Sequence, residues 1–80
     1  MKFLYEEKNK LAIYRLYRHN DYIVEITSQG KGKCDNVIDV STINDIFLFE
    51  KVEYDYFENT VKDVTANIDK WITESKNPTS

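Results

Sequence analysis

Residues 11–28 read LAIYRLYRHNDYIVEITS, and this stretch indicates the fold most directly. Two runs rich in Ile, Val, Leu and Tyr flank the cluster His19-Asn20-Asp21, whose residue types favour turns. Aromatic and β-branched runs bounded by turn residues are typical of β-strands. We therefore expect an antiparallel hairpin with strands at Leu11–Arg18 and Tyr22–Ser28.

The length of the turn decides which side chains of this hairpin share a face. A three-residue loop places Arg15 opposite Glu25, a complementary ion pair, whereas a two-residue loop places Arg15 opposite Ile26. The charge pairing favours the three-residue loop. One face then carries Tyr14, Leu16, Val24 and Ile26, and the opposite face carries Leu11, Ile13, Tyr17 and Ile23.

Further strand-like segments extend the hairpin into a sheet. Lys2–Glu7 is the first strand that we expect, and Val37–Thr42 is the fourth. Asn44-Asp45 favours a turn into a fifth strand at Ile46–Glu53. The segment Ser41–Phe49 is also compatible with a short helix, so the sequence predicts between three and five strands.

The C-terminal third of the chain has the repeat of an amphipathic helix, which we expect from Asp55 to Ser75. Asp55 followed three residues later by Glu58 resembles a capping pair, and Asn77-Pro78 ends the helical pattern. Apolar side chains recur every three or four residues at Tyr54, Phe57, Val61, Val64, Ile68, Trp71 and Ile72.

Together these elements predict an α+β domain, in which an antiparallel sheet packs against one long C-terminal helix. We expect the domain to span residues 1–76 and residues 77–80 to form a disordered tail. One helix covers only one face of a sheet. The Leu11, Ile13, Tyr17 and Ile23 set is therefore expected on an uncovered face, unless another strand or the segment Ile43–Phe49 folds over it.

Composition places this domain among folded proteins of a reducing compartment. The hydrophobic fraction is 41% and the aromatic fraction 14%, which argues against disorder. One cysteine cannot form an intramolecular disulfide, although small secreted domains usually need several. The first residues reach charges too soon for a signal peptide, and no apolar run is long enough to span a bilayer. We expect a cytoplasmic protein with no membrane contact.

Catalytic, cofactor and metal chemistry find no support in the residues. His19 and Cys34 are the single His and Cys, and neither lies in a nucleophile signature or suffices for a zinc site. The loop Gly30–Lys33 resembles a phosphate-binding loop only superficially, because Thr27 stands where its first glycine is needed. We therefore expect no enzyme activity, no cofactor and no metal.

Charge is distributed unevenly along the chain. Residues 1–34 carry a net charge of +3 and residues 35–80 a net charge of −6. An acidic half favours a basic partner surface, although it also suits an ordinary solvated face. The partner-binding residues that we predict on the acidic helix face are Asp55, Tyr56, Asp63, Asp69 and Glu74.

The sequence therefore predicts a non-catalytic protein-binding module that uses either the acidic helix face or the uncovered sheet face. Two alternatives stay open. A homodimer would pair the uncovered sheet faces of two copies. A single-strand nucleic-acid binder would use Tyr14, Tyr17 and the basic loop, but the overall acidity argues against direct nucleic-acid contact.

A strand beginning at Met1-Lys2-Phe3, a Tyr-rich hairpin and a helix ending at Trp71-Ile72 give the chain a recognisable layout. This layout resembles that of the small phage-encoded inhibitors of the anti-CRISPR kind. The resemblance implies an inhibitor of a larger nucleic-acid-handling complex, such as a CRISPR effector, acting in the host cytoplasm. Such inhibitors share no sequence signature, so no functional residue is carried over.

Overall fold

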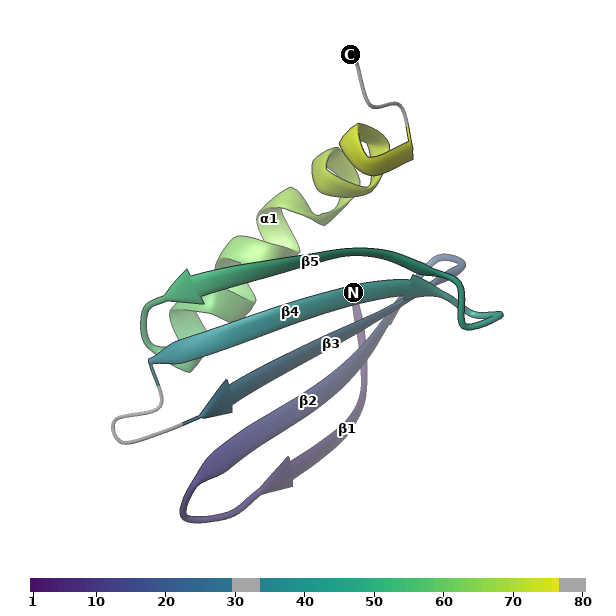
Figure 1. The fold of residues 1–80 in the computed structure, drawn as a ribbon. Helices are drawn as coiled ribbons and strands as arrows, with labels where there is room; N and C mark the ends of the chain where they lie inside the picture. The colour runs from purple at the N-terminus through teal and green to yellow at the C-terminus, as the bar shows by residue number, and fades with distance from the viewer. Residues whose placement is uncertain (30–33, 77–80) are drawn as a thin grey trace.

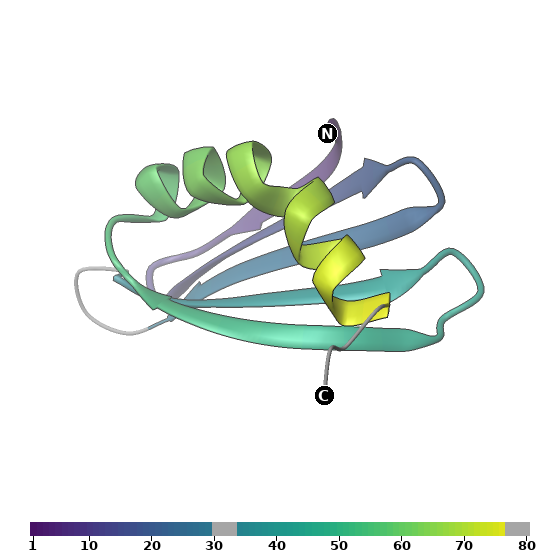
Figure 2. The ribbon, with the colours of Figure 1, turned by 90° about the horizontal axis from the view of Figure 1, so that it is seen from above.

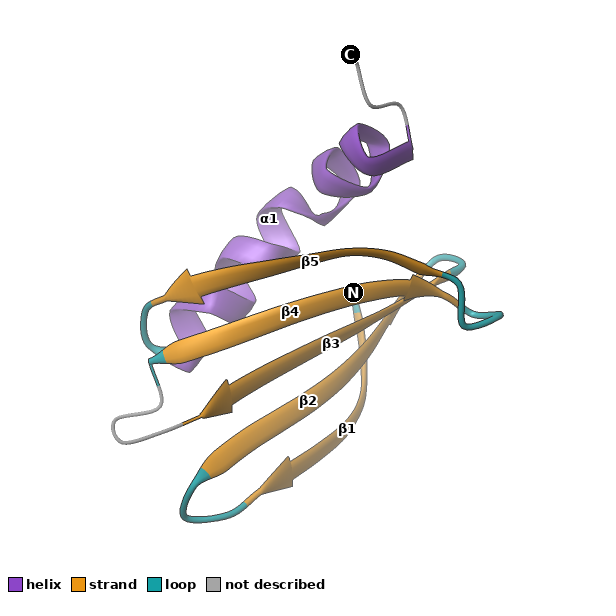
Figure 3. Cartoon of the chain, viewed as in Figure 1, coloured by secondary structure: helices purple, strands orange, loops and turns teal. Residues whose placement is uncertain are grey.

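The computed structural model describes residues 1–29 and 34–76, and it has the expected α+β architecture. Five antiparallel strands form one open sheet, and one helix follows them (Figures 1 and 3). The loop Gly30–Lys33 and the predicted tail 77–80 lie outside the described residues. The elements are β1 (Lys2–Lys8), β2 (Ala12–His19), β3 (Tyr22–Gln29), β4 (Asp35–Thr42), β5 (Phe47–Tyr54) and α1 (Phe57–Lys76).

The strands are ordered in space as in the chain, so that β1 and β5 form the two edges of the sheet. The segment Ser41–Phe49, which was also compatible with a short helix, contains the end of β4, a turn at residues 43–46 and the start of β5. The turn between β4 and β5 accounts for the absence of a helix in this described segment. The Thr42 hydroxyl accepts hydrogen bonds from the backbone N–H groups of Asn44 and Ile46, at 3.2 and 3.1 Å. Asp45 adopts a φ of 65°, a conformation that ends a helix and that Asp tolerates.

The predicted register of the first hairpin is wrong by one residue. His19 pairs with Tyr22 across a two-residue loop, which places Arg15 opposite Ile26. Asn20 has a φ of 55°, as two-residue hairpin turns require at their first position, and Asn accepts this conformation readily. Such turns match the twist of paired strands, and this geometry outweighs the Arg15–Glu25 charge pair.

Arg15 obtains its counter-charges from more distant elements instead. Its Nε donates to Glu6 on β1 at 2.6 Å, and its Nη1 lies 2.7 Å from a carboxylate oxygen of Glu58 on α1. The guanidinium also lies 5.0 Å from the ring centre of Phe57. Burial alone would lower the pKa of Arg15, but hydrogen bonds to Glu6 and Tyr17 raise it above its ordinary value.

The change of register exchanges the two predicted faces of β2. Ile13 and Tyr17, expected on the uncovered face, are 9% and 7% exposed and belong to the core beneath α1. Tyr14 and Leu16, expected in the core, alternate with them and therefore lie on the opposite face. On β3 the prediction was right: Val24 and Ile26 are buried.

Figure 2 shows α1 lying over one face of the sheet. The core consists of buried side chains from both layers. Each fully buried Ile or Val side chain in such a layer contributes about 1.5–3 kcal/mol. No described helix is long and apolar enough to cross a membrane. The buried apolar residues are Ile13, Tyr17, Val24, Ile26, Ile38, Val40, Phe57, Val64, Ile68 and Ile72.

The helix begins two residues later than predicted. The Tyr56 carbonyl accepts the first helical hydrogen bond, from the Thr60 N–H at 3.0 Å, so Asp55 lies just outside. The Asp55 carboxylate accepts a hydrogen bond from the Tyr56 N–H at 2.7 Å, and Glu58, engaged with Arg15, does not complete the predicted capping pair. Tyr54 is 79% exposed at the end of β5 and takes no part in the apolar helix face.

A buried side chain joins this helix start to the sheet. The Asn36 amide on β4 donates hydrogen bonds to the Asp55 carbonyl and the Thr60 hydroxyl, each at 2.7 Å. Asn36 is fully buried. Because the two acceptors lie on either side of the first helical residue, this contact fixes where α1 leaves β5.

Candidate functional site

The sheet has one face that no described element covers, and the register of four strands defines its centre. Leu16, Glu25, Asp39 and Glu50 lie opposite one another on β2, β3, β4 and β5. Adjacent strands are about 4.8 Å apart, so the three carboxylates follow one another closely. We call Glu25, Asp39 and Glu50 the acidic row.

Within the acidic row, Asp39 interacts unfavourably with Glu50. Burial raises the pKa of Asp39, and a hydrogen bond with Glu50 and the repulsion between the two carboxylates raise it further. Two carboxyl groups can form a hydrogen bond only while one of them holds a proton. Like charges directly opposite in a sheet are destabilising, so this pair weakens the isolated protein at neutral pH.

Tyrosine and apolar side chains surround the acidic row. The Tyr14 hydroxyl donates a hydrogen bond of 2.7 Å to the Glu25 carboxylate. Burial, together with this hydrogen bond, raises the pKa of Tyr14 to about 12. The Tyr5 ring lies 6.3 Å from that of Tyr14, and Val52 and Tyr54 on β5 are exposed. We call this surface, with the acidic row at its centre, the acidic sheet face.

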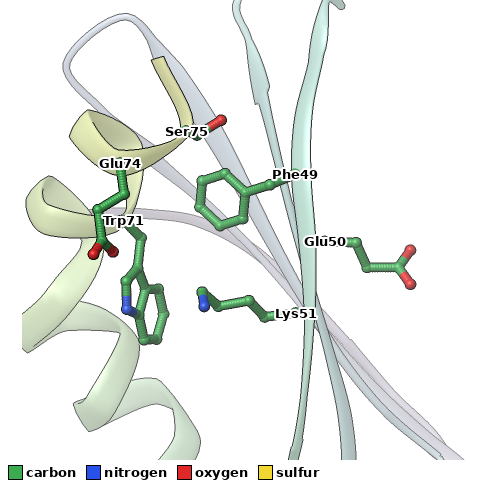
Figure 4. Close-up of a pocket in the computed structure, with 6 residues that line it drawn as sticks. All are labelled: Phe49, Glu50, Lys51, Trp71, Glu74 and Ser75. Atoms are coloured by element: carbon green, nitrogen blue, oxygen red, sulfur yellow. The ribbon is translucent and has the colours of Figure 1, made fainter. Parts of the chain in front are cut away.

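A second surface feature lies between β5 and the C-terminal half of α1 (Figure 4). Figure 4 shows Phe49 and Lys51 directed toward Trp71, and Glu50 directed away from it. The Lys51 ammonium lies 4.8 Å from the centre of the Trp71 ring, a cation–π contact. The cavity has a volume of about 230 Å³, and its lining is Phe49, Glu50, Lys51, Trp71, Glu74 and Ser75. We call it the β5–α1 groove.

Carboxylates gather at the other end of β5. Burial raises the pKa of Glu53 to about 7, and a hydrogen bond with Asp63 and the charges of Asp63 and Asp55 contribute, while Lys51 opposes the change. Glu53 and Lys51 are two residues apart on one strand and therefore share the face that α1 covers. Negative charge thus accumulates where β5 passes α1.

The predicted acidic helix face does not form a single surface. Asp63 and Glu74 are eleven residues apart, which places them within about 20° on one flank of α1, beside β5. Asp69 lies on the opposite flank, where its carboxylate meets His19 Nε2 at 2.7 Å. Asp55 precedes the helix, and Tyr56 is exposed at its start.

The predicted set for the uncovered sheet face is also divided. Leu11 is 75% exposed, but it lies between β1 and β2 rather than within a strand. Ile13 and Tyr17 are buried beneath α1, which contradicts their predicted place. Ile23 is half-buried and lies on the uncovered face, as predicted.

Sequence reasoning missed the acidic row itself. The alternation in β4 and β5 would have placed Asp39 and Glu50 on one face of their own strands. Their alignment with each other and with Glu25 depends on the pairing of β3 with β4 and of β4 with β5, and no single strand indicates either pairing.

The single histidine and the single cysteine lie at opposite ends of the sheet. His19 pairs with the first residue of β3, whereas Cys34 precedes the partner of its last residue. The length of β3 separates these ends by about 23 Å. Within residues 1–29 and 34–76, no group of three or more His, Cys, Asp or Glu side chains is placed to hold a metal ion.

No protein-family model, curated protein or solved structure matches the chain. Its function is therefore inferred from the two surfaces, the acidic sheet face and the β5–α1 groove.

Proposed function

We propose that this chain is a non-catalytic protein-binding module, and that it docks through the acidic sheet face onto a partner with basic side chains. The observation that carries the proposal is the row of Glu25, Asp39 and Glu50 at the centre of an uncovered, tyrosine-bearing face. Lysine or arginine groups from a partner would relieve the repulsion between Asp39 and Glu50. Tyrosine and apolar groups around them supply contact area of the kind that dominates protein interfaces.

A partner of different sequence fits this face better than a second copy. A two-fold dimer would bring one acidic row against another, and unpaired charges buried in an interface cost several kcal/mol. The same row repels the phosphates of a nucleic acid. A single-strand nucleic-acid binder would stack bases on Tyr14 and Tyr17. However, Tyr17 is buried, and the Tyr14 hydroxyl is held by Glu25.

The partner that we propose is a larger nucleic-acid-handling complex, which the chain inhibits or regulates. Carboxylates aligned across a sheet can occupy a basic groove that otherwise receives phosphates. The architectural resemblance to anti-CRISPR inhibitors agrees with this mode of action, and a CRISPR effector is one such complex. The proposed setting is the host cytoplasm.

The test removes two charges from the acidic row and compares the result with removal of two charges elsewhere. Asp39→Asn/Glu50→Gln changes the row, and Asp21→Asn/Asp45→Asn is the control because both of its residues lie in exposed turns. The immobilised chain is presented with a lysate of its host. We expect the wild type and the control to retain a partner, the row variant to retain at least about tenfold less, and heparin to displace the partner.

Two outcomes would contradict the proposal. One is retention that is equal for the row variant and the control. The other is a wild-type chain that retains nothing at low salt, where contacts between opposite charges are strongest.

A further inference from the structure

We infer that the outer edge of β5 and the flank of α1 beside it form a second docking site, which binds an extended peptide segment with an apolar side chain and a Lys or Arg two residues apart. The site uses the outer backbone edge of β5 and the side of this strand that faces α1, whereas the acidic sheet face uses the side chains on the opposite side of the sheet. Separate variants therefore test the two proposals, and failure of one does not decide the other.

The backbone of β5 lies at an edge of the sheet. Among the described strands, β5 pairs with β4 alone. The Asp55 N–H donates to the Cys34 carbonyl at 2.9 Å, which fixes the residues that bond toward β4. Because backbone groups point alternately to the two sides of an antiparallel strand, those of Tyr54, Val52 and Glu50 face the outer edge. An extended segment laid there would form the hydrogen bonds of a sixth strand.

A groove lies beside this edge. The Ser75 hydroxyl donates to the Leu48 carbonyl at 3.5 Å, so α1 approaches the edge at one end of β5. The β5–α1 groove opens next to it, with Trp71 and Phe49 as its apolar walls (Figure 4). Its volume of about 230 Å³ is below that of typical small-molecule sites. One large apolar side chain of an added strand fits this space better than a separate ligand.

The charged side chains beside the groove change sign along β5. Lys51 lies over Trp71, whereas Glu53, Asp63 and Asp55 gather two residues further along β5. Alternate residues of an added strand point to the same side, so a residue two positions from the apolar one reaches this acidic end. A Lys or Arg there would neutralise carboxylates that now repel one another. The occupant is therefore a basic, extended segment, bound by strand addition.

The direct test uses a synthetic peptide labelled with fluorescein. Its residues are Thr, except for Ile at the third position and Lys at the fifth. Binding is followed by fluorescence anisotropy. A peptide N-methylated at the backbone positions that would face β5 keeps every side chain but loses the hydrogen bonds. We expect the first peptide to bind the chain below about 1 mM and the methylated peptide to bind at least about tenfold more weakly.

Variants of the chain separate the backbone contact from the charge contact. Val52→Pro removes an N–H that faces the outer edge, where proline is tolerated, and Val52→Thr keeps that N–H. We expect Val52→Pro to weaken binding at least about tenfold and Val52→Thr to change it less than about twofold. Asp63→Asn should weaken binding of the Lys peptide but not of a peptide with Thr in its place. Asp39→Asn, on the acidic sheet face, should leave peptide binding unchanged.

The inference is overturned if neither peptide binds by about 1 mM, or if the methylated and unmethylated peptides bind equally. Analytical ultracentrifugation tests whether the edge of β5 binds a second copy of the chain. A concentration-dependent dimer that Val52→Pro abolishes would show that the occupant of the edge is a second copy of the chain, and would also contradict the inference.

Discussion

Asp39 is the residue at which stability and the proposed function conflict. Its carboxylate faces Glu50 across one strand pair and Glu25 across the other, and Tyr14 already donates its hydroxyl to Glu25. No cation approaches any of the three within ion-pair distance among the described residues. Sequences that retain a destabilising arrangement of this kind commonly do so at functional sites.

Asp39→Asn should therefore stabilise the isolated protein at pH 7. The pKa of Asp39 is raised in the folded state, so ionisation destabilises the fold as the pH rises above the ordinary value of 3.8. Removing the charge should increase the free energy of unfolding by about 0.5 kcal/mol, or the melting temperature by about 2–4 °C. Thermal unfolding followed by circular dichroism measures this change, with Asp21→Asn as the control.

The gain should fade below about pH 4, where the wild-type carboxyl is protonated as well. A variant that is less stable than the wild type at pH 7 would show that Asp39 supports the sheet rather than strains it.

The junction of β5 and α1 combines attractive and repulsive contacts. Lys51 and Trp71 attract each other, and Ser75 bonds to Leu48, whereas Glu53 and Asp63 bring two carboxyl groups together. Of these contacts, the one between the two carboxyl groups depends on a group that titrates near neutral pH. The attachment of the helix to the edge strand is therefore expected to respond to pH.

Glu53→Gln should remove part of this pH dependence. Because the pKa of Glu53 is about 7 in the folded protein and 4.5 ordinarily, the folded state binds more protons between these values. Stability contributed by the protonated form is present below about pH 4.5 and is lost as the pH rises to about 7. Glu53 is partly exposed, so solvent screening limits the loss to about 1 kcal/mol.

Urea unfolding followed by the fluorescence of Trp71, the single tryptophan, measures this change across that pH range. We expect the free energy of unfolding of the wild type to fall with rising pH, and that of Glu53→Gln to fall less. Asp63→Asn should act in the same direction, because it removes the neighbour of Glu53. Equal slopes for the wild type and Glu53→Gln would contradict this account of the junction.

Across the fold, the sequence predicted the strands and the helix well, but it predicted which side chains share a face only in part. Alternation and helical periodicity are local signals, and they indicated both ends of every strand and of α1 to within two residues. The face of β2 depends on one residue of loop length, since a shift by one reverses every side chain of a strand. The Arg15–Glu25 pairing suggested the longer loop, but Arg15 binds Glu6 and Glu58 instead.

The candidate site was harder to predict for the same reason. The acidic row requires the correct pairing of β3 with β4 and of β4 with β5, and the β5–α1 groove requires the path of the helix across the sheet. Neither relation is encoded within one segment. Charge composition did indicate an acidic surface, but it assigned that surface to the helix, where Asp69 and Asp63 lie on different flanks.

Carboxyl footprinting of the chain bound to its captured partner locates the surface that the partner covers. Carbodiimide coupling modifies accessible Asp and Glu side chains, and mass spectrometry locates each modified residue in the bound and the isolated protein. The acidic row should lose most of its modification in the complex, while Asp21, Asp45 and Asp69 keep theirs. Unchanged modification of Glu25, Asp39 and Glu50 in the complex would show that the partner binds elsewhere.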